Sequence, residues 1–408
     1  MKNFLISLGL LCLASNAAFC EESLNIRENY VSKWGRLELN NNQLCSSNGS
    51  KIQLAGWNAN PDTLASFDAC SAETQFAQMN LWGAKVVRVT TFANKFERDS
   101  DSELLKMKDY IAQSANAGLY CIVNWDILTP DTAATGEGDP NKSLENAKLF
   151  FSEISSFIKE NNLNHVLYEI CSEPGVIPWN SIKEYADSLL PSIADNDPNA
   201  VVIVGTPQWN QKLTEASLNP ITHNSLQIMY AFQYYACNHE TLLGEFKNAM
   251  TSIPIFATEW SSSSFDGADL CFDATENFLN SCSTNDQAVS WCFNGWFSEN
   301  ENFSTLKKAC DFSESNITSI GKLIIQSAET VSKVKNLDNS HIAITSDFAN
   351  VISINTDETG SATISTATGT SKVVNIAEGD NKINAAPGLY IVNLTTASAS
   401  RVEKVLVK

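Results

Sequence analysis

Two glutamates stand at the ends of segments that have the character of buried strands. Glu173 closes the apolar segment 166–173, and Pro174 then stops the sheet because proline has no backbone N–H. Glu259 closes the segment 253–259 in the same way. The carboxyl end of a strand is where barrel enzymes carry their reactive groups. Two such acids are the minimum set for cleaving a glycosidic bond.

The strands that would carry these acids recur regularly along the chain. Apolar, β-branched runs are found at 52–57, 84–90, 119–125, 165–170, 200–205, 225–230, 253–258 and 288–293, with amphipathic stretches such as 103–117, 143–161 and 182–194 between them. Eight strands alternating with helices over about 250 residues predict a (β/α)8 TIM barrel. The alternative, a doubly wound open sheet, usually carries a glycine-rich phosphate turn, and none is found in the sequence. Residues 30–51, with Asn-Asn and Asn-Gly turns, predict a hairpin that closes the bottom of the barrel.

Polar and aromatic residues at the predicted strand ends would share one rim of this barrel. The set comprises Trp57, Asn58, Arg88, Asn124, Trp125, Asp126, Ser172, Glu173, Gln208, Trp209, Gln233, Tyr235, Glu259 and Trp296. Any one of them fits a surface or core role. Together, at one rim, they predict a binding cleft.

Eight segments in the same order resemble glycoside hydrolase family 5, in particular its bacterial endo-β-1,4-glucanases, over residues 30–302. They are Gly56-Trp57, 81–88, 122–128, 166–174, 203–206, 230–236, 256–260 and 290–298. The resemblance implies a barrel and a retaining mechanism, with Glu173 as acid/base and Glu259 as nucleophile. It also implies that Tyr235 hydrogen-bonds the nucleophile and that Trp296 lies beneath the sugar at the cleavage point.

A retaining mechanism makes separate demands on the two acids. Their carboxyl groups lie ~5 Å apart, so that one attacks the sugar carbon while the other protonates the leaving oxygen. Glu173 must be protonated near neutral pH, which burial and a nearby carboxylate favour. Glu259 must be ionised, and Arg88 is the cation expected beside it. Trp179 and Trp209 offer further flat faces along the cleft, with core packing as the alternative.

The chain departs from the family pattern at several positions. Ser172 stands where the family has an asparagine that donates to the sugar 2-hydroxyl, and Leu64 where many relatives carry a stacking tryptophan. Asn60, Asp126 and Gln233 stand in place of histidines. Asp126 therefore adds negative charge to a site that already holds two acids.

Three classes of function follow from these matches and departures. The first is a hydrolase of plant cell-wall β-glycans, in particular an endo-β-1,4-glucanase. The second is a barrel that binds glycan without turnover, and the third is a surface or structural scaffold. A pure binder needs no pair of acids, which favours the enzyme. The backbone sugar and the choice between endo and exo action stay open.

The composition of the chain excludes several classes of binding partner. The formal net charge of −19 argues against nucleic acid and anionic membranes, since both need a basic face. No metal or organic cofactor is implied, because the four histidines are scattered and the acidic runs lack calcium-loop spacing. The expected partner is a β-linked polysaccharide or oligosaccharide, and the expected form is a monomer.

The cysteines show no metal pattern. Cys271 and Cys282 flank a predicted helix and would lie ~16 Å apart at ~1.5 Å rise per residue, too far for a disulfide. Cys121, Cys171 and Cys292 fall in predicted strands, where a buried free thiol is expected.

The two ends of the chain predict export. Residues 1–20 read as a signal peptide, with Lys2, an apolar stretch at 4–13 and small residues at 15–18. The barrel is assigned to 21–328. Residues 329–408 lack tryptophan and alternate in short runs (342–345, 351–355, 362–365, 372–376, 388–394 and 403–407), which predicts a small all-β sandwich.

The end of this second domain resembles the carboxyl-terminal sorting domains of the type IX secretion system, through segments 386–394 and 402–408. The resemblance implies secretion machinery as a partner and a protein secreted or held at the surface of a Gram-negative bacterium. A carbohydrate-binding module is the alternative. It would expose aromatic residues, and Phe348 and Tyr390 are the only ones in this region.

Overall fold

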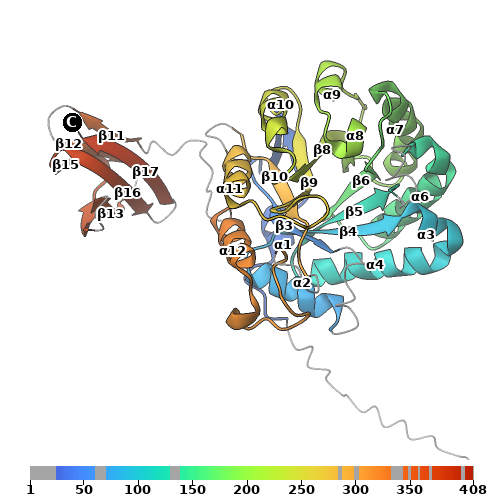
Figure 1. The fold of residues 1–408 in the computed structure, drawn as a ribbon, viewed down its shortest axis with the longest axis horizontal. Coiled ribbons are helices and arrows are strands. Elements are labelled where there is room, and N and C mark those ends of the chain that lie inside the picture. Colours follow the sequence, from blue (N-terminus) through green and yellow to red (C-terminus); the bar gives the residue numbers. More distant parts are fainter. Residues whose placement is uncertain are drawn as a thin grey trace, which may run out of the picture.

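The computed structural model describes residues 24–59, 70–128, 138–283, 287–297, 303–331, 343–347, 351–356, 359–366, 370–396 and 400–407. Eight strands close into a barrel in the order β10-β3-β4-β5-β6-β7-β8-β9, and all eight neighbouring pairs are parallel (Figure 1). The strands are β3 (Ala55–Ala59), β4 (Val86–Phe92), β5 (Tyr120–Asp126), β6 (Val166–Ser172), β7 (Val201–Val204), β8 (Gln227–Tyr235), β9 (Ile255–Ser261) and β10 (Ser290–Phe293). The predicted TIM barrel is confirmed.

Helices surround the barrel (Figure 1). The longer ones are α2 (Ala72–Leu81), α4 (Ser100–Asn116), α6 (Leu144–Glu160), α7 (Trp179–Ala194), α11 (Phe272–Ser281) and α12 (Ser319–Val331). Shorter helices are α3 (Ala93–Arg98), α8 (Pro207–Asn210), α9 (Thr214–Leu218) and α10 (Leu243–Ala249), with single 3-10 turns η2 (Pro140–Ser143), η3 (Glu240–Leu242) and η4 (Glu314–Asn316). Side-chain caps fix two of the starts: Ser71 accepts from the Thr74 amide and Asp99 from the Ser102 amide. In α6, residues such as Phe150, Ile154 and Ile158 form the buried stripe that faces the sheet.

A small unit closes the amino-terminal end of the barrel, and the hairpin predicted over 30–51 is confirmed for 38–45, whereas residues 30–34 form a helix. The unit consists of α1 (Tyr30–Trp34) and the antiparallel pair β1 (Glu38–Asn40) and β2 (Gln43–Cys45). Leu37 and Leu44 from this unit pack in one apolar cluster with the first inward residues of the strands, such as Val86 and Ile122.

Directly above this apolar layer the barrel interior becomes polar. Since side chains on one face of a strand recur every second residue, the residue two positions beyond an inward apolar residue also points inward. Arg88 thus follows Val86, Asn124 follows Ile122, and Glu169 follows Leu167. On β4, β5 and β6 the interior therefore changes from a packed base to a polar upper layer within one step along the strand.

Two disulfides tie loops of this domain together. Cys70 pairs with Cys310, and Cys237 pairs with Cys271. Helix α11 separates Cys271 from Cys282, which confirms that these two do not bridge. Cys121, Cys171 and Cys292 are buried free thiols, also as expected.

The carboxyl-terminal region forms two sheets, one in the order β11-β12-β15 and the other in the order β14-β13-β16-β17. The strands are β11 (Ala343–Asp347), β12 (Val351–Thr356), β13 (Gly360–Thr366), β14 (Ser371–Ile376), β15 (Gly379–Asn384), β16 (Gly388–Thr396) and β17 (Ser400–Val407). Isoleucines of both sheets, including Ile354 and Ile364, share one core, so the predicted sandwich is confirmed. Strand β15 was missed, because its polar sequence carries a single buried apolar residue, Ile383.

Several expectations lie outside the described residues: the signal peptide at 1–20, Asn60, Leu64 and Phe348. The division into 21–328 and 329–408 stays a prediction, and its boundary falls within the last turn of α12, which ends at Val331. Across the described segments, no helix is long and apolar enough to cross a membrane.

The layered core predicts a large difference between two leucine truncations. Leu167 is 1% exposed beneath the charged layer, whereas Leu105 is 72% exposed on α4. We expect Leu167→Ala to lower the free energy of unfolding of the barrel by about 2–5 kcal/mol. The control Leu105→Ala should change it by less than about 0.5 kcal/mol. Urea unfolding followed by tryptophan fluorescence measures this in the barrel alone, because 329–408 contains no tryptophan. Equal losses for the two variants would contradict the layering.

Candidate active site

The strands carry local irregularities where they reach the polar layer. The register shifts between Asn124 and Asp126 on β5, and between Ala231 and Gln233 on β8. A third shift lies between Trp291 and Phe293 on β10. Bulges increase the local twist and re-aim the side chains that follow them. In each case the partner strand spans one residue more: β6 between Glu169 and Ser172, and β9 between Phe256 and Glu259 and between Ala257 and Trp260. The bulges thus lie on the strand that leads to Glu173 and on the strand that carries Glu259.

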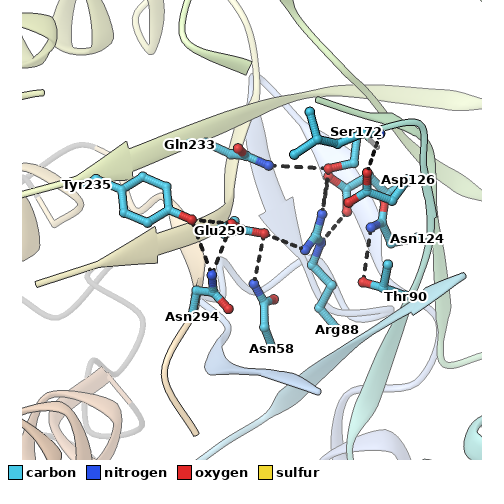
Figure 2. Close-up of polar contacts among 12 residues, drawn as sticks. Asn58, Arg88, Thr90, Asn124, Asp126, Ser172, Gln233, Tyr235, Glu259 and Asn294 are labelled. Atoms are coloured by element: carbon cyan, nitrogen blue, oxygen red, sulfur yellow. Dashed lines mark hydrogen bonds and ion pairs between the residues drawn. The ribbon is translucent and has the colours of Figure 1, made fainter. Parts of the chain in front are cut away.

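Arg88 lies at the centre of the polar layer and is 2% exposed. Its Nε donates to Glu169 Oε2 at 2.5 Å and its Nη2 to Glu169 Oε1 at 3.3 Å, a two-point ion pair. The same guanidinium donates from Nη1 to Glu259 Oε2 at 3.1 Å and from Nη2 to Ser172 Oγ at 2.8 Å (Figure 2). Arg88 therefore joins β4, β6 and β9 through one rigid group.

Glu259 accepts hydrogen bonds from four side chains. Tyr235 OH donates to Oε1 at 2.6 Å, and Asn294 Nδ2 donates to the same oxygen at 3.1 Å. Arg88 Nη1 at 3.1 Å and Asn58 Nδ2 at 3.4 Å donate to Oε2 (Figure 2). Donors directed at both oxygens stabilise a carboxylate over a carboxylic acid. They also fix the plane of the group.

Glu173 directly follows β6 in a left-handed conformation, with φ 59°. A residue with a side chain adopts this conformation only where its surroundings enforce it. Two amides of the loop after β7 do so: Trp209 N–H donates to the Pro174 carbonyl at 2.7 Å and Gln208 N–H to that of Gly175 at 3.0 Å. Gly175 N–H in turn donates to the Gly138 carbonyl at 2.7 Å. The backbone at Glu173 is thus fixed from both sides.

The surroundings of Glu173 favour its neutral form. Burial, followed by the charges of Glu259 and Asp126, raises the pKa of Glu173 well above its usual range, while Arg88 and a hydrogen bond from Gln233 oppose the rise. The charge of Glu259 acts on Glu173 because both acids lie at one rim. Hydrogen-bond donors thus surround one acid, while burial and like charge favour the neutral form of the other.

Ser172 and Gln233 belong to the layer beneath the rim. Ser172 is fully buried, and its Oγ accepts from Arg88 Nη2 at 2.8 Å and from Gln233 Nε2 at 3.3 Å. Its hydroxyl group therefore orients Arg88 and Gln233. It does not face the rim, as it would have to do to replace the family's asparagine in donating to the sugar 2-hydroxyl.

The prediction that Trp179 and Trp296 present a flat face to the sugar is wrong. Trp179 is 2% exposed, packs against Tyr230 and donates from Nε1 to the Asn219 carbonyl at 2.9 Å, because it begins α7 on the face turned toward the strands. Trp296 is also 2% exposed, lies edge-on to Trp57 and donates to Gln75 Oε1 at 2.8 Å. Neither side chain offers a free face to a sugar.

Trp209 remains a candidate platform. It is partly exposed, in the left-handed turn of Gln208, Trp209 and Asn210 that supports the loop after Glu173.

Sequence reasoning missed Asn294 and Glu169. Asn294 follows β10 and donates to both Glu259 and Tyr235, at 3.1 and 3.3 Å. Sequence reasoning instead placed Trp296, two residues later, in the site. Glu169 could have been found, because an acid in phase with the inward Leu167 must be buried and needs a cation. Within the described segments, no group of three or more His, Cys, Asp or Glu residues is arranged to hold a metal ion.

A (β/α)8 barrel whose carboxyl rim gathers one glutamate surrounded by hydrogen-bond donors and another buried beside like charge has the form of a barrel glycoside hydrolase. The comparisons agree. The sequence profile described as Cellulase (glycosyl hydrolase family 5) matches residues 45–300. The chain belongs to glycoside hydrolase family 5.

Two curated relatives and one solved structure show the extent of the similarity. The chain is 32% identical to Endoglucanase E-5 of Thermobifida fusca over 248 residues, which is 58% of this chain and 50% of that protein. It is 33% identical to an endoglucanase of Clostridium saccharobutylicum over 246 residues, 57% of this chain and 51% of that protein. The crystal structure of the catalytic domain of Thermobifida fusca endoglucanase Cel5A superposes with a TM-score of 0.65 at 27% identity, covering 73% of this chain and 99% of that domain. The chain spans about half the length of the curated relatives it matches.

The buried ion pair predicts a specific pattern of stability losses. Arg88→Leu leaves Glu169 buried without its cation, so we expect the free energy of unfolding to fall by about 3–5 kcal/mol. The double variant Arg88→Leu/Glu169→Leu removes both charges and should recover a large part of that loss. A double-mutant cycle by urea unfolding measures the coupling. Additive losses would show that the two groups do not depend on each other.

Proposed function

We propose that this protein is a retaining β-glycosidase that hydrolyses plant cell-wall β-glycans, most closely an endo-β-1,4-glucanase. The observation that carries the proposal is the contrast between two neighbouring acids: four donors surround Glu259, while burial and like charge favour the protonated form of Glu173. A retaining mechanism needs that division of roles. The relatives named endoglucanases support the substrate class, and Thermobifida fusca Cel5A has been solved in complex with cellotetraose.

In the proposed reaction, Glu259 attacks the anomeric carbon while Glu173 donates its proton to the glycosidic oxygen. The bond between that carbon and the leaving oxygen breaks, and an ester forms between the sugar and Glu259. Water then attacks the same carbon, Glu173 takes its proton, and the carboxylate of Glu259 is released. Tyr235 and Asn294 orient the attacking oxygen of Glu259, since both donate to Oε1.

Replacing each acid by glutamine should reduce the activity of the enzyme in a different way. We expect Glu259→Gln to lower kcat on barley β-glucan by ~10⁴-fold or more, because no nucleophile remains, while glycan binding survives. Glu173→Gln should lower kcat/KM strongly on the polysaccharide and far less on an aryl β-cellobioside whose leaving group needs no proton. Reducing-sugar assays on β-glucan, glucomannan and xylan, with calorimetric binding, make the comparison.

The control is Glu276→Gln, on the exposed side of α11, which should keep full activity. Undiminished hydrolysis by Glu259→Gln would end the assignment of the nucleophile. Glycan affinity without turnover in the unaltered protein would favour a binding barrel, and the absence of both would favour a scaffold.

For the carboxyl-terminal sandwich we propose a role in export, as a sorting domain of the type IX kind. The support is the resemblance of 386–394 and 402–408. Residues 388–394 lie on β16 and residues 402–407 on β17, and these two strands pair. Together with the predicted signal peptide at 1–20, this role would place the protein outside the cell or on its surface.

A fusion experiment tests the sorting role. Residues 329–408 are attached to a reporter that carries a signal peptide, in a bacterium with type IX secretion. We expect the reporter in the medium or at the surface, and in the periplasm when the secretion channel is deleted. The same reporter without the domain is the control. Equal export of both reporters would contradict the proposal.

A further inference from the structure

The upper layer of the barrel holds more acid than base. Four carboxyl groups, those of Asp126, Glu169, Glu173 and Glu259, are each at most 9% exposed. In the described part of the chain, the ion pairs made by this cluster all go to Arg88. The undescribed segments 60–69, 129–137 and 298–302, which follow β3, β5 and β10 in sequence, contain no lysine or arginine. Ionisation of all four acids would leave a large uncompensated negative charge in a buried space, which is unfavourable.

Two of the four acids accept hydrogen bonds from several donors. Glu169 receives two bonds from Arg88, and Glu259 receives bonds from Arg88, Asn58, Tyr235 and Asn294. The excess of acid over base therefore disfavours ionisation of the other two acids, Glu173 and Asp126, and burial raises the pKa of each.

Asp126 ends β5 directly beside this rim. It pairs in register with Ser172 of β6, the residue before Glu173, and its Oδ1 accepts from the Leu128 amide at 2.8 Å. Burial raises the pKa of Asp126 to about 7, with the charges of Glu259 and Glu169 adding to the rise and Arg88 and the Leu128 amide opposing it. Asp126 in turn raises the pKa of Glu173.

The titratable and charged groups that act on Asp126 or respond to it come from three strands. They are Arg88 on β4, Glu169, Cys171 and Glu173 on or just after β6, and Glu259 on β9. Arg88 already contacts Glu169 and Glu259, so its charge is shared among several acids. Asp126 is thus an acid beside Glu173 whose charge acts on it, second to that of Glu259, and whose ionisation falls near neutral pH.

We propose that Asp126 is a positioning residue for the catalytic proton: its carboxyl group keeps Glu173 protonated at neutral and mildly alkaline pH. The proposal rests on the proposed function, because it assigns Glu173 the role of acid. When Asp126 ionises as the pH rises, its negative charge opposes the formation of a second carboxylate on Glu173. The acid therefore retains its proton to higher pH than it would without Asp126.

The direction of the predicted effect follows. Asp126→Asn removes the negative charge and keeps an oxygen that can accept from the Leu128 amide. Glu173 then loses its proton at lower pH, so the alkaline limb of the kcat/KM profile on β-glucan should move down by at least ~0.5 pH unit. Asp126→Glu keeps the charge and should keep the limb nearer to that of the unaltered protein. Asp187→Asn removes an acid from the exposed face of α7 and should leave the profile unchanged.

A second substrate distinguishes the loss of the Asp126 charge from a structural distortion of the site by the substitution. An aryl β-cellobioside whose leaving group needs no proton does not depend on Glu173 as an acid in the first step. The alkaline limb of kcat/KM for that substrate should therefore not move in Asp126→Asn. Movement of both limbs together, or a uniform loss at all pH values, would overturn the proposal in favour of a structural role.

The outcomes also distinguish this inference from the proposed function. Hydrolysis by the unaltered protein together with an unmoved alkaline limb of the kcat/KM profile in Asp126→Asn ends the inference alone. Absence of hydrolysis by the unaltered protein on every glycan ends both. If Asp126→Asn does not fold, Asp126→Ser also removes the charge and leaves a hydroxyl oxygen near the Leu128 amide, and the same shift is required of it.

Discussion

Arg88 is buried among carboxyl groups at the top of the barrel interior, and the chemistry proposed for this protein depends on how its single positive charge is distributed. Its guanidinium contacts Glu169, Glu259 and Ser172 at fixed angles. A lysine could not reproduce this, because an ammonium group has no planar fork of donors. Arg88 thus connects the stability of the barrel to the charge state of its rim. Glu169 holds the guanidinium in place, and the guanidinium holds Glu259.

The barrel supplies the geometry for this arrangement at little extra cost. Alternation along the strands places an apolar layer at the base and the charged layer directly above it. Bulges on β6 and β9, opposite β5, β8 and β10, then re-aim the last residues of β6 and β9. Glu173 follows β6 with a left-handed backbone that is held by amides of the loop after β7. Strained backbone of this kind is found where a side chain must be aimed in one direction.

The sequence was sufficient for the parts governed by periodicity and by strand ends. The eight strands, the hairpin at the base and the sandwich follow from alternation, and the structure places Arg88, Tyr235, Glu173 and Glu259 at one rim. The sequence was insufficient where the packing of distant segments decides whether a side chain is buried or exposed. Trp179 and Trp296 are of the residue type that stacks on sugars, but neighbouring segments of the chain cover both of them. The covering contacts come from residues far away in the sequence, Asn219 for Trp179 and Gln75 for Trp296. The extension of β8 to Tyr235 was missed because a register shift interrupts its pairing with β9 after Ala231.

The most direct test of the account is to trap the proposed covalent intermediate. A 2-deoxy-2-fluoro-β-cellobioside slows both steps of a retaining reaction, while its good leaving group keeps the first step fast enough for the glycosyl-enzyme to accumulate. We predict that mass spectrometry of the digested protein finds one 2-deoxy-2-fluorocellobiosyl group, a disaccharide, on the peptide that contains Glu259, and none in the Glu259→Gln variant. An adduct on another acid, or an inverted product from an enzyme that forms no adduct, would contradict it.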